Sequence, residues 1–126
     1  MSPIIEKMEI FPVAGTDCME LNLSGAHAPY FTRNIVILTD SNGVEGVGEV
    51  PGGQKITAAL EAVKNLVVGT RLVDYKQTLN KIRKWLDANI KDDVRGLQTF
   101  DLRTGVHVVT AVEAPLLDLM GKFLDV

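Results

Sequence analysis

Residues 35–50 read I-V-I-L-T-D-S-N-G-V-E-G-V-G-E-V, two runs rich in β-branched residues on either side of Asn42-Gly43. Asn and Gly both tolerate positive φ, and this pair between two such runs is a strong signal for a β-hairpin. The stretch therefore predicts two neighbouring antiparallel strands joined by a turn at residues 40–43.

Two further strand signals precede this hairpin. Residues 4–13 alternate in part between the two faces of an edge or half-buried strand. One face carries Ile4, Met8 and Ile10, and the other carries Ile5, Lys7 and Glu9. Residues 19–23, M-E-L-N-L, alternate apolar and polar side chains and are expected to pair beside residues 4–13. Residues 24–29, S-G-A-H-A-P, have the composition of a loop.

The hydrophobic period changes to that of a helix after Gly53. A first helix is predicted from Ile56, Leu60, Val63 and Val67, with Gly69 as its stop. Asp74 and Gln77 resemble a capping box for a second helix. The apolar face of this second helix carries Tyr75, Leu79, Ile82 and Leu86.

A third helix is predicted near the C-terminus, with Thr104 as its cap. Its apolar face carries Val108, Val112, Leu116, Leu119 and Phe123. Pro115 lies inside this helix, where it removes a backbone hydrogen bond and costs about 3 kcal/mol. We expect the helix to continue through Pro115 with a bend. Residues 94–103 show no clear period.

Strands that come first and helices that follow predict an α+β fold rather than alternating β and α. We expect one domain over residues 1–126, with a three-stranded antiparallel meander at residues 1–50 and a helical layer at residues 53–126. A (β/α)8 barrel needs about 250 residues, so the 126 residues are too few to include one.

Composition narrows the functional class. Hydrophobic residues make up 46% of the chain and charged residues 23%, which is ordinary for a globular domain. The net charge of -3 gives no electrostatic footprint for nucleic acid, and no apolar run is long enough to span a membrane. The single cysteine, Cys18, suits a reducing compartment. We therefore expect a cytoplasmic protein that binds neither nucleic acid nor membrane.

Residue types that commonly act in catalysis or bind metal ions form no recognisable motif in this sequence. His27 and His107 lie far apart in the sequence, with no cysteine at metal-ligand spacing. Glu113 and Asp118 are five positions apart on a helix and point in different directions. Gly46-x-Gly48 lacks the third glycine of a dinucleotide fingerprint. We therefore predict no catalytic residue and no metal ligand in this chain.

Residues 111–126 read A-V-E-A-P-L-L-D-L-M-G-K-F-L-D-V. They resemble the helix that ends the N-terminal capping domain in the mandelate racemase and muconate lactonizing branch of the enolase superfamily, where A-x-E-x-A-L-x-D-L-x-G-K-x-L-G-x precedes a catalytic (β/α)8 barrel. Pro115 departs from this pattern. Four further segments resemble D-glucarate dehydratases: residues 22–29, 31–36, 46–53 and 95–104.

This resemblance implies the capping domain of a carbon–oxygen lyase that converts D-glucarate, and its epimer L-idarate, to 5-keto-4-deoxyglucarate. In that family, barrel residues abstract the proton α to a carboxylate, and Mg²⁺ stabilises the enediolate. The metal ligands therefore belong to the barrel, and the isolated chain is expected to be inactive. Motif matching makes Asn22, His27 and Thr99 the substrate-binding residues. The aldarate substrate, the barrel domain and further copies of the chain are the expected partners.

Other interpretations stay open at this point. Asn22 could be an exposed strand residue or a turn cap, and Thr99 could cap or hydrogen-bond locally. His27 and Arg33, in a stretch without acidic residues, would suit an anionic ligand. The chain could also be a stand-alone, non-catalytic α+β domain that binds a partner or ligand. A third possibility is a paralogue related to glucarate dehydratase but with altered activity.

Overall fold

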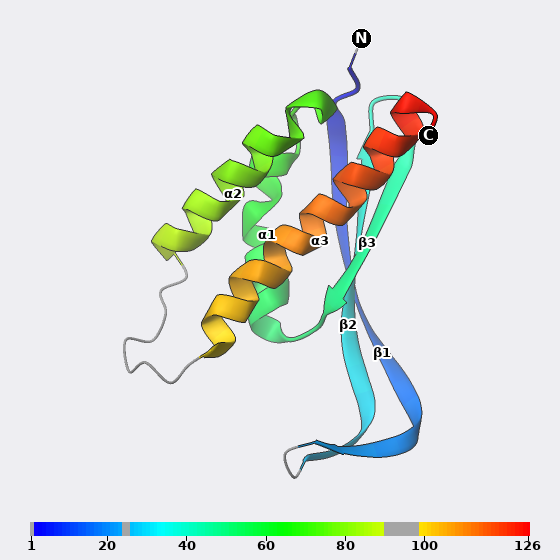
Figure 1. Cartoon of the computed structure of the whole chain (residues 1–126), viewed down its shortest axis with the longest axis vertical. Coiled ribbons are helices and arrows are strands. Elements are labelled where there is room, and N and C mark those ends of the chain that lie inside the picture. The colour runs from blue at the N-terminus through cyan, green and yellow to red at the C-terminus, as the bar shows by residue number, and fades with distance from the viewer. Residues whose placement is uncertain (1, 24–25, 90–98) are drawn as a thin grey trace.

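The computed structural model describes the backbone of residues 2–23, 26–89 and 99–126, and the side chains of residues 2–14, 32–89 and 104–126. The elements are β1 (Ile5–Leu23), β2 (Ala26–Asp40), β3 (Glu45–Pro51), α1 (Gln54–Val67), the 3₁₀ helix η1 (Leu72–Asp74), α2 (Tyr75–Asn89) and α3 (Thr99–Leu124). The strands form one antiparallel sheet in the order β1-β2-β3. The helices lie together beside this sheet (Figure 1), so the predicted α+β meander with a helical layer is confirmed.

The hairpin between β2 and β3 forms at the predicted turn, but with different backbone angles. Only Gly43 has positive φ, at 80°, whereas Asn42 does not. The Gly43 amide donates to the Asp40 carbonyl at 3.0 Å, and the Asp40 amide donates to the Val44 carbonyl at 2.9 Å. This three-residue loop needs one left-handed position, and glycine fills it.

The buried carboxylate of Asp40 completes the turn. It accepts hydrogen bonds from the Asn42 amide at 2.8 Å and from the Val44 amide at 3.0 Å. We expect Asp40→Ala to lower the free energy of unfolding by about 1–3 kcal/mol, because both amides lose their acceptor. Asp40→Asn keeps one side-chain oxygen and should cost less. Urea unfolding of the two variants measures the difference, and an equal cost would contradict the role of the oxygen.

The two faces of β1 do not follow the predicted alternation. The register shifts between Ile5 and Lys7, so that Ile5 pairs with Asp40 and Lys7 pairs with Thr39. This bulge rotates the strand. Ile5 and Met8 are therefore both buried, whereas Ile4 is exposed. The prediction that put Ile4 on the same face as Met8 is wrong.

The predicted pairing of residues 19–23 with residues 4–13 is also wrong. Both segments belong to the single strand β1, and residues 21–23 pair instead with residues 26–28 of β2. Residues 26–29, whose composition predicts a loop, therefore lie in β2. Both segments pair with the continuous strand β2, so they form one long strand. Neither segment indicates this by its own sequence.

The predicted core faces of α1 and α2 are confirmed. The buried residues of α1 include Ile56, Leu60, Val63 and Val67, and those of α2 include Leu79, Ile82 and Leu86. Tyr75 is partly buried against the same core. Gly69 follows α1 with φ 92°, as expected for a stop. The turn η1 comes before α2, and the Asp74 carboxylate lies 3.9 Å from the Arg71 guanidinium.

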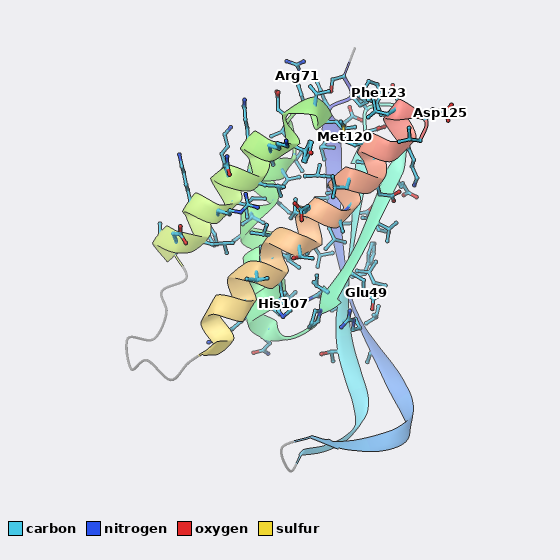
Figure 2. The ribbon with its side chains drawn as sticks, in the orientation of Figure 1. Glu49, Arg71, His107, Met120, Phe123 and Asp125 are labelled. Carbon is cyan, nitrogen blue, oxygen red and sulfur yellow. The ribbon has the colours of Figure 1, made fainter. Side chains whose placement is uncertain are left out.

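Helix α3 begins earlier than predicted. It starts at Thr99, so Thr104 is not its cap but a buried residue inside the helix. Most of the predicted core face is buried: Val108, Val112, Leu116 and Leu119. Phe123 is the exception, with 41% exposure, because it lies in the last turn near the C-terminus (Figure 2). The predicted connection at residues 91–93 lies outside the described residues.

Pro115 is buried within the continuous helix α3, at its contact with β3. A Cβ atom at Gly48 would lie 2.6 Å from Pro115 Cδ and 3.2 Å from the Ala111 carbonyl oxygen. Pro115 has no N–H to donate to that carbonyl. The glycines of β3 therefore let α3 pack closely at the proline, which is the structural role of the Gly46-x-Gly48 pattern.

Candidate functional site

The sheet narrows from three strands to two at one end. The strand β3 pairs with β2 only as far as Arg33↔Pro51, whereas β1 and β2 continue beyond that row as a two-stranded ribbon, made of residues 14–23 of β1 and 26–32 of β2. Figure 1 shows the resulting ribbon projecting away from the helices, at the end of the molecule opposite both termini. The first turn of α3 lies toward the same end.

Two of the three predicted substrate-binding residues lie near the tip of this ribbon. Asn22 of β1 and His27 of β2 are Cα partners in the antiparallel ladder. The structure therefore places them opposite one another, although the sequence alone would allow Asn22 in a strand and His27 in a separate loop. Their side chains lie outside the described set.

Thr99 is the first residue of α3. A threonine at a helix start suits a local capping role as well as a ligand contact, because its hydroxyl can bond either a nearby amide or a bound molecule. Its side chain and residues 90–98 lie outside what the structure describes. The prediction for Thr99 therefore stays a prediction.

A depression of about 660 Å³ lies at the base of the ribbon, where the three-stranded part of the sheet ends. Its walls come from β1, β2, the β3–α1 corner and the first turns of α1. They consist of Pro12, Val13, Ala14, Thr32, Arg33, Gly52, Gly53, Gln54, Thr57 and Ala58. This volume is in the range of small-molecule pockets, but among the described residues that line it Arg33 is the only one with a charged side chain.

The charge of Arg33 already has a partner. Its Nε atom donates to Glu49 Oε2 across the β2–β3 pair at 2.7 Å. Figure 2 shows Glu49 on β3 near the base of the ribbon. The expected suitability of Arg33 for an anionic ligand is therefore reduced, because a nearby carboxylate competes for the guanidinium. Glu49 acts as the hydrogen-bond acceptor that its place near the strand end suggests.

The carboxylate of Asp118 on α3 also has structural contacts. Asp118 Oδ2 accepts from the Val47 amide at 3.1 Å, which occupies a donor on the free edge of β3. Lys122 Nζ donates to the Glu45 carbonyl at 2.6 Å and lies 3.4 Å from Asp118. Within the described residues, His, Cys, Asp and Glu nowhere gather in a group of three that could hold a metal ion.

One buried polar cluster was not anticipated from the sequence. Asn34 is fully buried in β2, and its Oδ1 accepts from Thr57 Oγ1 at 3.0 Å. Its Nδ2 lies 3.5 Å from the Pro51 carbonyl. The only signal in the sequence is an amide directly before the apolar run 35–38, at a position where a core residue would be expected.

The chain is similar over 95% of its length to a protein named probable glucarate dehydratase from Streptomyces coelicolor, with 30% identity over 131 residues. The chain spans only 29% of the length of that relative. No family model matches the chain.

Solved structures show the same fold. An enolase from Pseudomonas fluorescens Pf0-1, crystallised with magnesium, potassium and tartrate, matches the whole chain with a TM-score of 0.86 and 25% identity, over 30% of its own length. An enolase from Thermobispora bispora, crystallised with magnesium and formate, matches 98% of the chain with a TM-score of 0.81 and 28% identity, again over 30% of its own length. A mandelate racemase/muconate lactonizing protein from Herpetosiphon aurantiacus matches 98% of the chain, over 32% of its own length, at 11% identity and a TM-score of 0.75, which is a likeness of fold alone. The fold is that of the N-terminal domains of the enolase superfamily.

In the described part of the chain, none of the helices combines the length and the apolar character needed to cross a membrane.

Proposed function

We propose that this chain is the capping domain of a sugar-acid dehydratase that acts on D-glucarate and L-idarate. The observation that carries the proposal is the similarity to the probable glucarate dehydratase along 95% of the chain. The fold, shared with enolase-superfamily N-terminal domains, supports the same conclusion.

In this proposal the chain contributes substrate contacts rather than the chemical step. Asn22 and His27 on the ribbon, together with Thr99 at the start of α3, would contact the distal carboxylate and hydroxyl groups of the diacid. An amide, an imidazole and a hydroxyl all donate hydrogen bonds to such groups. The pairing of Asn22 with His27 supports a shared contact. The ribbon would also help to exclude water from the reacting end of the substrate.

Mg²⁺ is expected from the resemblance, but the described residues do not fit it. They offer no cluster of three possible ligand side chains, the Glu49 carboxylate is paired with Arg33, and the Asp118 carboxylate accepts from the Val47 amide. In this proposal the barrel domain of the complete enzyme would hold the metal ion.

A chimera tests this function. The chain would replace the segment of the Streptomyces coelicolor relative to which it is similar, and D-glucarate turnover would be followed with Mg²⁺ present. We expect the chimera to form 5-keto-4-deoxyglucarate, and we expect no turnover by the isolated 126-residue chain. The intact relative is the positive control.

Turnover by the isolated chain would contradict the proposal, and so would a folded, Mg²⁺-binding chimera without activity toward any aldarate. A chimera that acts only on another sugar diacid would favour a paralogue of altered activity.

We also propose that the chain associates with further copies of itself. Apolar side chains are exposed on the sheet face opposite the helices, including Phe11 at 42% and Val47 at 49% exposure. Exposed apolar surface of this kind supports contact with another domain or chain.

A further inference from the structure

The side chain of Asn34 is fully buried, and burying its amide costs free energy. A buried amide needs hydrogen-bond partners to offset the loss of water. Asn34 obtains them from two neighbouring elements: Thr57 of α1, and the Pro51 carbonyl at the end of β3. The amide therefore joins β2 to the corner at which β3 turns into α1.

Thr57 connects this amide to the same corner from the other side. Its hydroxyl lies 3.0 Å from Asn34 Oδ1 and 2.9 Å from the Gly53 carbonyl, so that one proton is shared between two acceptors. The main chain adds a further link, because the Gly52 amide donates to the Thr32 carbonyl at 2.9 Å. A Cβ atom at Gly52 would lie 2.6 Å from Thr32 Oγ1, so the corner packs tightly on β2.

These contacts lie where the ribbon begins. The last row with three strands is Arg33↔Pro51, directly beside Asn34 and Thr32. An isolated two-stranded ribbon is at best marginally stable. The direction in which the ribbon projects therefore depends on how its base is held against the body.

We propose that Asn34 and Thr57 are positioning residues, which hold the base of the ribbon so that Asn22 and His27 reach the substrate. This inference rests on the proposed function and extends it, because it assigns the placing of the substrate contacts near the tip of the ribbon to a cluster at its base. The Asn34 amide holds β2 to the β3–α1 corner, and the Thr57 hydroxyl holds the amide in place.

Residual dipolar couplings of backbone amides in the 126-residue chain test the positioning directly. In the wild type, the couplings of residues 26–28 and 30, which have backbone N–H groups, should fit the same alignment as those of the helices. Thr57→Val removes the hydroxyl but keeps the shape and β-branching. In this variant we expect that the ribbon couplings no longer fit the alignment of the helices. Thr57→Ser retains the hydroxyl, so its ribbon couplings should fit that alignment as in the wild type.

Thr78→Val is the matched control. Thr78 is buried in α2, and its hydroxyl lies 3.4 Å from the Asp74 carbonyl, a contact that involves no part of the ribbon base. This variant should lose stability without changing the ribbon couplings. Asn34→Val should act as Thr57→Val does; if Asn34→Val fails to fold, Thr57→Val still decides the question.

Three results would overturn the inference: unchanged ribbon couplings in folded Thr57→Val, the same loss in Thr78→Val, or wild-type ribbon couplings that do not share the alignment of the helices. In an active chimera, Thr57→Val should raise KM for D-glucarate more than it lowers kcat. An unchanged KM there would also count against the positioning role. Failure of the parent chimera to turn over aldarates concerns the proposed function alone, because the couplings do not depend on turnover.

Discussion

Replacing Gly46 with alanine is expected to lower the free energy of unfolding by about 3 kcal/mol, the upper end of the usual cost of overpacking a core. A Cβ atom at this position would overlap the Pro115 carbonyl oxygen and lie 2.8 Å from Leu119 Cγ. The clash with a helix backbone cannot be relieved by rotating a side chain, so α3 would have to move away from β3. Urea unfolding of the 126-residue chain measures the effect.

Gly105→Ala is the matched control with the opposite expected sign. Gly105 lies inside α3, and an added Cβ atom would meet nothing within 4 Å. Alanine lowers the conformational entropy of the unfolded chain there, so we expect stabilisation by about 0.5–1 kcal/mol. Equal stability of Gly46→Ala and the wild type would show that α3 does not pack on β3 at this distance.

Replacing His27 or Thr99 with alanine in the active chimera should lower kcat/KM for D-glucarate by about tenfold to a hundredfold. Loss of one hydrogen bond to a charged group costs about 1.5–3 kcal/mol, which corresponds to that range. Because neither residue is proposed as a metal ligand, the dependence of the rate on Mg²⁺ concentration should not change. Steady-state kinetics at varied substrate and Mg²⁺ concentrations provide both readouts.

Each variant has a control of the same type elsewhere in the chain. His107 is half-buried on α3, and Thr110 is exposed on the same helix. Neither residue is assigned a substrate contact, so His107→Ala and Thr110→Ala should keep the kcat/KM of the parent chimera. Wild-type kinetics in both His27→Ala and Thr99→Ala would remove these residues from the site.

Local patterns in the sequence determined the order and type of the elements. The Asn42-Gly43 hairpin, the apolar spacing of α1 and the apolar spacing of α2 all depend on residues close together in the chain. Such signals predict the strands-then-helices order because hydrophobic period and turn chemistry act over a few residues. The substrate contacts Asn22, His27 and Thr99 came from a family resemblance and not from local physics, and they stay predictions.

The sequence-based predictions for the faces and length of β1 are wrong because its register and length depend on pairing with β2. The bulge near Glu6 buries both Ile5 and Met8, because pairing with β2 sets the register of β1. The same partner strand joins residues 4–13 and 19–23 into one strand. The alternation of side chains within β1 predicts neither the bulge nor the joining of the two segments, because the register is set by how β1 and β2 pair.

The tertiary structure alone decided how the base of the ribbon and the contact between α3 and β3 are built. Asn34 meets Thr57 across a sequence separation of 23 residues, and Gly46 and Gly48 meet Pro115 across a larger one. A glycine pair in a strand, a proline in a helix and a buried amide each break a local rule. They become favourable only when the chain packs, because close approach of backbones and the sharing of hydrogen bonds are properties of the folded contacts and not of the segments.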